Sequence, residues 1–259
     1  MGTLCSLPRA QNWQQAQQIT RFPLQMANLS GLGLSEPWLL RMAGDRHWQL
    51  IAQTAGQTGV ALHDADGHSI YAAFCSTALR IAPRARGLMD AQVTLESTLY
   101  QVSSARLGSV HVLSHPEMGI LACLRMISCF LCHDETGSNR RLMRKSLPGL
   151  SPLPLAPTEV MALERSARDA ARLARSVGPE TPILCYTPLP ALDFNAVGLL
   201  YFPTFSKIAE MARPHWNAGI TRNVTYLSNL DAGEDILVET MDAGLLLRAQ
   251  DGRALAVID

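Results

Sequence analysis

The chain has 259 residues, of which 47% are hydrophobic and only 17% are charged. Average soluble chains carry roughly 25% charged residues, so this composition excludes a disordered protein. Lys plus Arg and Asp plus Glu number 22 each, which gives no support for nucleic acid or an anionic membrane as the main partner. No run approaches the roughly 20 apolar residues of a membrane helix, and the first residues lack the pattern of a secretory signal. We therefore expect a cytoplasmic protein of one large domain or two small ones.

The N-terminal part predicts one helix followed by several strands. Residues 35–56 favour a helix, because Ser35 is a good N-cap and Pro37 lies in the first turn. From about residue 70 the chain alternates between apolar and polar residues in four runs rich in β-branched and aromatic side chains. A helix followed by antiparallel strands is an α+β pattern.

A proline-rich segment divides the chain. Residues 146–159 carry four prolines, too closely spaced for a helix or a central strand, and they follow a basic cluster at residues 140–145. We interpret this segment as a linker. Residues 158–177 then predict a helix with Thr158 as its cap. Its apolar stripe is narrow, so we expect the helix to lie on a surface.

The C-terminal part repeats the pattern of the N-terminal part. It predicts a short strand at 183–190, a helix at 202–216 and four short strands near the end. Segments 28–48 and 193–216 both contain a polar residue, a glycine, a helix and a final His-Trp pair, which indicates a duplication. The expected units are 1–145, a linker and connecting helix at 146–180, and 181–259.

Two groups of motifs resemble a known family. DFNAVGLLYFPTFSKIAEMA, residues 193–212, resembles the start of the central helix in hotdog-fold acyl-thioester enzymes, where Asp-x-Asn, a glycine turn and Tyr-Phe follow one another. GLSEPWLL, GDRHWQLIA and DADGHSIYAAF resemble the double-hotdog acyltransferase/decarboxylases of polyketide pathways, typified by the leinamycin type. The resemblance covers about residues 25–259. It implies an α+β double hotdog, two tandem units that each wrap a long central helix in an antiparallel β-sheet.

The resemblance also implies an activity and its partners. Such an enzyme takes a (methyl)malonyl group from CoA, decarboxylates it and places the product on the phosphopantetheine of an acyl carrier protein. It uses no metal or organic cofactor, since CoA and phosphopantetheine only carry the substrate. The expected partners are acyl-CoA and an acyl carrier protein, without nucleic acid or membrane, and a homodimer stays open. An acidic carrier would dock on the basic cluster at residues 140–145.

The family pattern implies a catalytic tyrosine in the first hotdog. The best match is Tyr71, in GHSIYAAF, and Tyr100 is the reserve. A phenol has an ordinary pKa of about 10, so a nucleophilic role needs a base or a donor-rich site. The alternative is that Tyr71 is an interior aromatic residue of a strand.

The two glycine turns are the next candidates. A helix N-terminus presents unpaired N–H groups, which could stabilise the enolate left by decarboxylation. Gly33, with Leu34 beside it, and Gly198 would let a substrate approach the backbone closely. Both glycines could equally be plain turn residues.

Polar residues beside these turns complete the predicted site. Ser35 is either an N-cap or a substrate contact, and Glu36 either a favourable first-turn charge or a substrate contact. Asn195 could orient a thioester or a carboxylate, or only form the turn. Asp193 is a substrate-binding candidate rather than a base, because decarboxylation needs none. His47 is a weaker candidate, since it could simply bond a nearby carbonyl.

Three other activities compete with this reading. A thioesterase would need Asp193 or Glu36 as general base. A dehydratase of this fold usually carries His-x-x-x-Gly-x-x-x-x-Pro, which neither His63 nor His68 begins. A non-catalytic hotdog would only dock a carrier protein.

The pattern Cys129-x-x-Cys132-His133 matches haem attachment, but a strand would point its two cysteines to opposite faces, which also disfavours zinc.

Overall fold

The computed structural model describes residues 16–57, 59, 61–83, 85–215, 219–242 and 244–259. The elements up to residue 144 are β1 (Gln17–Pro23), the 3-10 helix η2 (Met26–Asn28), β2 (Leu29–Ser30), β3 (Gly33–Leu34), α1 (Glu36–Thr54), β4 (Leu62–His63), β5 (Ser69–Ile81), β6 (Gln92–Ser103), β7 (Arg106–His115), β8 (Gly119–His133) and β9 (Leu142–Arg144). The remaining elements are α2 (Thr158–Ser176), β10 (Leu184–Tyr186), α3 (Pro190–Asp193), α4 (Phe202–Ala212), β11 (Ile220–Tyr226), β12 (Ile236–Met241), β13 (Gly244–Ala249) and β14 (Ala254–Ile258).

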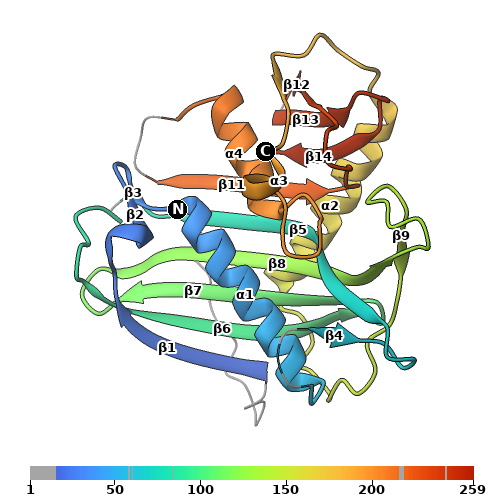
Figure 1. The fold of residues 1–259 in the computed structure, drawn as a ribbon. Helices are drawn as coiled ribbons and strands as arrows, with labels where there is room; N and C mark the ends of the chain where they lie inside the picture. Colours follow the sequence, from blue (N-terminus) through green and yellow to red (C-terminus); the bar gives the residue numbers. More distant parts are fainter. Residues whose placement is uncertain (1–15, 58, 60, 84, 216–218, 243) are drawn as a thin grey trace.

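One antiparallel sheet runs through both halves of the molecule. Its strand order is β1-β6-β7-β8-β5-β11-β14-β13-β12-β10, with β4 paired to β5 and β9 paired to β8. The halves meet where β5 pairs with β11, from Ile81 opposite Ile220 to Ser76 opposite Thr225. Helices α1 and α4 cross one face of this sheet and α2 lies behind it (Figure 1). Each half is therefore a helix packed on its own antiparallel strands, as the predicted double hotdog requires.

Helix α1 forms where the sequence predicts it. The Ser35 side chain accepts a hydrogen bond from the backbone N–H of Trp38 at 3.4 Å, which confirms the N-cap. Leu40 and Ala43 bury their side chains against Leu79 and neighbouring strand residues of the sheet. Burial of this apolar face is the main stabilisation of the helix on the sheet.

The other two long helices differ in detail from the prediction. Helix α4 ends at Ala212, short of residue 216, because Arg213 precedes a proline and takes a non-helical conformation. In α2 the N-cap is Pro157, which makes no side-chain bond, so the predicted capping role of Thr158 is wrong. Helix α2 packs Val160 and Leu163 against the sheet, on the face opposite α1.

The proline-rich linker is irregular but packed. The N–H of Gln101 in β6 donates to the carbonyl of Pro154 at 2.8 Å, and Ala156 donates back to Gln101 at 2.9 Å. Leu147 is buried in the cluster beneath α1. The linker therefore passes along the sheet and carries the chain from the face of α1 to the face of α2.

The two His-Trp pairs do not occupy equivalent places. His47 and Trp48 lie inside α1, whereas His215 follows the end of α4 and Trp216 lies outside the described residues. No helix within the described ranges has the length and apolar character that a bilayer crossing requires.

Candidate active site

A cavity opens where the two halves of the sheet separate. Strand β5 pairs with β11 only over residues 76–81, and its earlier residues curve away from β11 (Figure 1). The cavity of about 970 Å³ in this gap is lined by residues of α1, α2 and the start of α4, of the loop before α4, and of strands β5, β7, β8, β9 and β11. Its size is that of a pocket for a small-molecule ligand.

The cavity has an aromatic side and a basic side. From α1, α4 and the strand positions that face them come Trp48, Phe74, Phe202, Phe205 and Tyr226. From β7, β9 and α2 come Arg106, Arg144, Arg168, Arg172 and Arg175. An apolar group fits the first side, and phosphates or carboxylates fit the second.

Tyr71 lies on the cavity wall and is bonded to a histidine. Its phenol oxygen lies 2.7 Å from Nδ1 of His133, and Nε2 of His133 lies 2.7 Å from Oδ1 of Asn139. The amide nitrogen of Asn139 donates to the carbonyls of Gly198 at 2.7 Å and Leu230 at 2.9 Å. Those carbonyls fix the orientation of the amide, so its oxygen faces His133 and must accept. Nε2 of His133 therefore carries the proton, and Nδ1 accepts from the phenol.

The three side chains form a hydrogen-bonded row that could move a proton away from the phenol. Burial raises the pKa of Tyr71, so the phenol stays protonated unless a partner takes its proton. Nδ1 of His133 is placed to take it, and Asn139 holds the ring in the required tautomer. Tyr71, His133 and Asn139 thus lie in the order that a nucleophile, its base and an orienting group would have.

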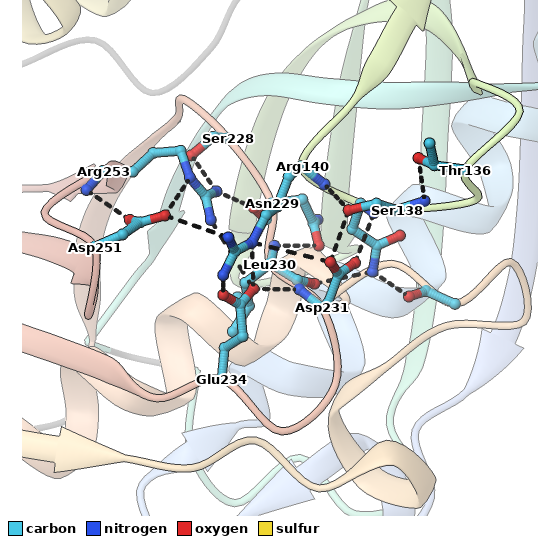
Figure 2. Close-up of polar contacts among 12 residues, drawn as sticks. Thr136, Ser138, Arg140, Ser228, Asn229, Leu230, Asp231, Glu234, Asp251 and Arg253 are labelled. Carbon is cyan, nitrogen blue, oxygen red and sulfur yellow. Dashed lines mark hydrogen bonds and ion pairs between the residues drawn. The ribbon is translucent and has the colours of Figure 1, made fainter.

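A dense polar cluster holds Asn139 in place. The carboxylate of Asp231 accepts from the Ser138 hydroxyl and from the Asn139 backbone N–H, both at 2.7 Å (Figure 2). Nearby, Nε of Arg140 donates to Glu234 at 3.2 Å. These contacts fasten the β8–β9 loop of the N-terminal half to the β11–β12 loop of the C-terminal half.

The predicted basic cluster is divided among different roles. Arg140 is paired with Glu234, and Nζ of Lys145 lies 2.9 Å from Oδ2 of Asp64. Arg140 and Arg144 both line the cavity, whereas Lys145 does not. Positive charge therefore reaches the cavity from α2 and from part of the 140–145 cluster, and not from that cluster as a unit.

Asn195 lines the cavity, whereas Gly198 does not. Oδ1 of Asn195 accepts from the N–H groups of Val197 at 3.1 Å and Leu199 at 3.0 Å, which forms the turn. This leaves the amide N–H groups of Asn195 to donate toward a ligand. Gly198 has a φ of +78°, and its carbonyl binds Asn139 rather than the cavity.

Asp193 lies off the cavity wall. The side chain is only 1% exposed and its Oδ2 accepts from the Tyr186 hydroxyl at 2.7 Å and the Leu189 N–H at 2.9 Å. Its Oδ1 pairs with Lys207. The structure gives Asp193 the role of anchoring α3 and the turn before α4.

The predicted residues at the N-terminal turn also lie away from the cavity. Gly33 has a φ of +122°, and a Cβ there would lie 2.1 Å from the carbonyl oxygen of Ala85. Leu34 donates its N–H to the same carbonyl at 3.1 Å, and Ser35 caps α1. Close backbone packing, rather than a ligand, accounts for the glycine.

Glu36 is an ion-pair partner between the halves. Its Oε2 lies 2.8 Å from Nη1 of Arg222 on β11, and Nη2 of Arg222 lies 2.8 Å from Glu210 on α4. Burial raises the pKa of Glu36, with Arg222 opposing. The carboxylate faces the α1–β11 contact and not the cavity.

His47 is fully buried on the side of α1 that faces the sheet. Its ring nitrogens lie 2.8 Å from the Ser109 hydroxyl and 2.7 Å from the Ser128 hydroxyl, and His111 continues the row from Ser109. It was expected to bond a carbonyl and bonds hydroxyls instead. Burial lowers the pKa of His47 to about 3, so the ring is neutral. Its ring centroid lies 5.1 Å from that of Phe74, which lines the cavity, but His47 itself does not line it.

Two residues of the row, His133 and Asn139, were not predicted from the sequence, and the reserve tyrosine, Tyr100, does not line the cavity. His133 was considered only within the haem-like pattern, and Asn139 was not singled out. Strand alternation was the available signal. Tyr71 pairs with Leu131 of β8, and Cys129 and His133 lie two residues to either side of Leu131, so they point to the same face as Tyr71. Cys132 packs in the opposite core, as the strand reading predicted. Tyr100 is buried beneath α2.

Comparisons with known proteins bear on the fold. No protein-family model matches the chain, and no curated protein sequence does. The 12:0-ACP thioesterase from Umbellularia californica is similar with a TM-score of 0.61 and 11% identity, covering 93% of this chain and 92% of that one. A putative oleoyl thioesterase from Lactobacillus plantarum has a TM-score of 0.60 and 12% identity, covering 95% and 94%. An acyl-ACP thioesterase from Bacteroides thetaiotaomicron has a TM-score of 0.56 and 9% identity, covering 93% and 96%. At these identities the likeness shows the fold alone, and it confirms the predicted double hotdog across nearly the whole chain.

Proposed function

We propose that this protein is an acyl-thioester enzyme that takes an acyl group from CoA onto Tyr71 and passes it to an acyl carrier protein. The observation that carries the proposal is the row Tyr71–His133–Asn139 on the wall of a cavity with one aromatic and one basic side. Its substrate class is the (methyl)malonyl thioester implied by the sequence resemblance, and decarboxylation accompanies transfer.

The first step needs only groups on the wall. The Tyr71 oxygen attacks the thioester carbonyl carbon while Nδ1 of His133 takes the phenol proton. The carbon–sulfur bond breaks, and the leaving CoA thiolate takes that proton from His133. Tyr71 then carries the acyl group as an ester.

Decarboxylation needs a carboxylate site and donors for the enolate. The arginines of the basic side can hold the carboxylate in position. When its C–C bond breaks, CO2 leaves and the electron pair moves to the carbonyl oxygen, which Asn195 N–H groups and the N-terminus of α4 can stabilise. The enolate carbon takes a proton from solvent. The phosphopantetheine thiol of the carrier then displaces Tyr71.

A thioesterase is the second candidate, because the three similar solved structures are named as thioesterases. In that case water would displace Tyr71 or be activated directly by a carboxylate. The two carboxylates predicted for that task, Asp193 and Glu36, are paired with Lys207 and Arg222 and lie off the cavity wall. Neither predicted base can therefore activate a water in the cavity, and the carboxylates that do line it are those of Asp45 and Glu164.

Intact-mass measurement tests the proposal. The protein is incubated with malonyl-CoA or methylmalonyl-CoA, with and without a phosphopantetheinylated carrier protein. The expected result is a carrier whose added acyl group has lost the mass of CO2. Free acid and free CoA alone would support the thioesterase, and no turnover with either thioester contradicts both. A Tyr71→Phe variant that keeps full transfer contradicts the assignment of the nucleophile.

A further inference from the structure

Two thiols lie on the cavity wall beside Tyr71. Cys129 of β8 is paired with Ala73 of β5, two residues from Tyr71 along the same strand. The register of β5 shifts between Phe74 and Ser76, and this bulge places Cys75 against Cys129. Both cysteines line the cavity, and both are partly accessible.

The surroundings of the pair differ for its two members. The thiols are hydrogen-bonded to each other, and this bond, together with burial, raises the pKa of Cys75. The same bond, with Arg144 and Arg106, lowers the pKa of Cys129. Cys75 is thus placed to donate toward the sulfur of Cys129, which lies beside two arginines. A thiolate held in this way is the nucleophilic form of cysteine.

The other described cysteines have no such place. Cys123 is buried in the cluster under α2, and Cys132 is buried in the core beneath α1. Cys185 is exposed on β10, away from the cavity. Within the described residues, Cys75 and Cys129 are the two thiols that a cavity ligand can touch.

We propose that Cys129, supported by Cys75, is a second covalent acyl site of this cavity. It takes the acyl group of a CoA or phosphopantetheine thioester by thiol–thioester exchange, and it rests on the proposed acyl-thioester function. The sulfur of Cys129 attacks the carbonyl carbon and a new carbon–sulfur bond forms. The old carbon–sulfur bond breaks, the departing thiolate takes up the proton given up by Cys129, and nothing is oxidised or reduced.

The position of the pair makes the exchange compatible with Tyr71. Tyr71, Ala73 and Cys129 share one face of the β5–β8 pair, because paired residues and alternate residues point to the same side. A thioester held near Tyr71 therefore lies along the same wall as Cys129. Arg106 and Arg144 stand beside the thiol on the basic side of the cavity, where an anionic substrate would lie.

Peptide mapping after a single incubation tests the site. The full-length protein is mixed with malonyl-CoA, quenched in acid, digested and analysed by mass spectrometry. We expect an acyl group on the peptide containing Cys129 in wild type and in Tyr71→Phe, and its loss in Cys129→Ser. Cys185→Ser, which changes a thiol far from the cavity, should keep the label.

Alkylation by iodoacetamide gives a readout that does not depend on turnover. The alkylation rate of Cys129 should rise with pH with a midpoint below about 8.5, the usual pKa of a free cysteine, so that the thiol already reacts at pH 7. Malonyl-CoA should protect it. Cys75→Ala should slow this reaction roughly tenfold, since one pKa unit changes the thiolate fraction by that factor. Cys75→Ser, which keeps a donor, should slow it less.

The outcomes separate the two proposals. Normal transfer in Cys129→Ser together with no label on Cys129 in wild type overturns the thiol site and leaves the proposed function standing. Ordinary alkylation of Cys129, unchanged by Cys75→Ala, also overturns it. If no variant turns over or binds the thioesters, the proposed function fails, and the acyl site fails with it.

Discussion

Nη1 of Arg222 lies 2.8 Å from Oε2 of Glu36, and this contact joins the first turn of α1 to β11 in the other half of the molecule. Both side chains are almost buried, with 10% and 12% of their surface exposed. The guanidinium also donates to the carbonyl of Ser206 at 3.0 Å and to Glu210 at 2.8 Å. One arginine therefore ties α1, α4 and β11 together.

Removing Glu36 should weaken this junction. Glu36→Ala leaves Arg222 partly uncompensated in a buried place, so we expect a loss of about 3 kcal/mol in the free energy of unfolding. Glu36→Gln, which keeps an acceptor oxygen, should lose less. Urea unfolding measures both. An Ala variant with unchanged stability and abolished acyl transfer would instead make Glu36 a substrate residue.

The buried histidines should make the protein sensitive to acid. Burial lowers the pKa values of His47 and His111 to about 3, whereas unfolded histidines titrate near 6.5. Above pH 6.5 neither state binds these protons, and as the pH falls toward 3 only the unfolded state takes them up. The folded state should thus lose about 3 kcal/mol per histidine by pH 4.5.

Unfolding measured from pH 7 to 4.5 tests this dependence. The slope with pH should be smaller in His111→Gln than in wild type, because one buried titrating group has been removed. NMR titration of the ring signals gives a direct check. An imidazole of His47 that titrates near pH 6.5 in the folded protein would contradict the expectation.

Gly33 and Gly31 offer a matched pair of substitutions. Gly33→Ala places a Cβ 2.1 Å from the Ala85 carbonyl at a φ of +122°, so it should destabilise the fold by more than about 2 kcal/mol. Gly31→Ala meets no atom within 4 Å and should be nearly neutral. Thermal unfolding compares them. If Gly33→Ala instead keeps its stability and loses substrate affinity, the glycine contacts substrate.

The tautomer of His133 should depend on Asn139. Asn139→Ala removes the acceptor for Nε2–H, so we expect kcat for acyl transfer to fall by roughly 10²-fold or more with little change in KM. Ser138→Ala is the control, because it loses the bond to Asp231 and leaves the His133 contact in place. Equal effects of the two substitutions would show that Asn139 only holds the loop.

Charge on α2 should set the affinity for the substrate. Arg172 lines the cavity, whereas Arg165 is exposed on the same helix and does not. Arg172→Glu should raise KM for an acyl-CoA roughly fivefold to tenfold and reduce its salt dependence, since about 1 kcal/mol of attraction is lost. Arg165→Glu makes the same change in charge and should have little effect. Equal KM values in the two variants would show that Arg172 does not contact the phosphates of the acyl-CoA.

The sequence predicted the pieces of the fold better than their contacts. Alternation predicted four strands from about residue 70, which are β5 to β8, and the motif selected Tyr71, which lines the cavity. The partner of Tyr71 is His133, 62 positions away, and only the register of β5 against β8 brings them together. Strand β1 lacks a strong apolar alternation and was not predicted.

Charged residues were misread for a physical reason. Glu36 and Asp193 stand beside helix starts, where a carboxylate is favourable in any protein. Their cations, Arg222 and Lys207, lie on other elements, so the sequence could not show that the carboxylates were already paired. Pairing of this kind is decided by tertiary packing and not by local pattern.

The amide of Asn139 belongs to the N-terminal half, but the carbonyls of Gly198 and Leu230 that orient it belong to the C-terminal half. An isolated N-terminal half would still carry Tyr71, His133 and Asn139, but it would lose the two carbonyls that orient the Asn139 amide toward His133. The two halves are therefore unequal in the proposed site: one carries the proposed nucleophile and base, and the other orients the amide that bonds the imidazole. Neither half could be removed, or replaced by the corresponding half of another protein, without disrupting the site.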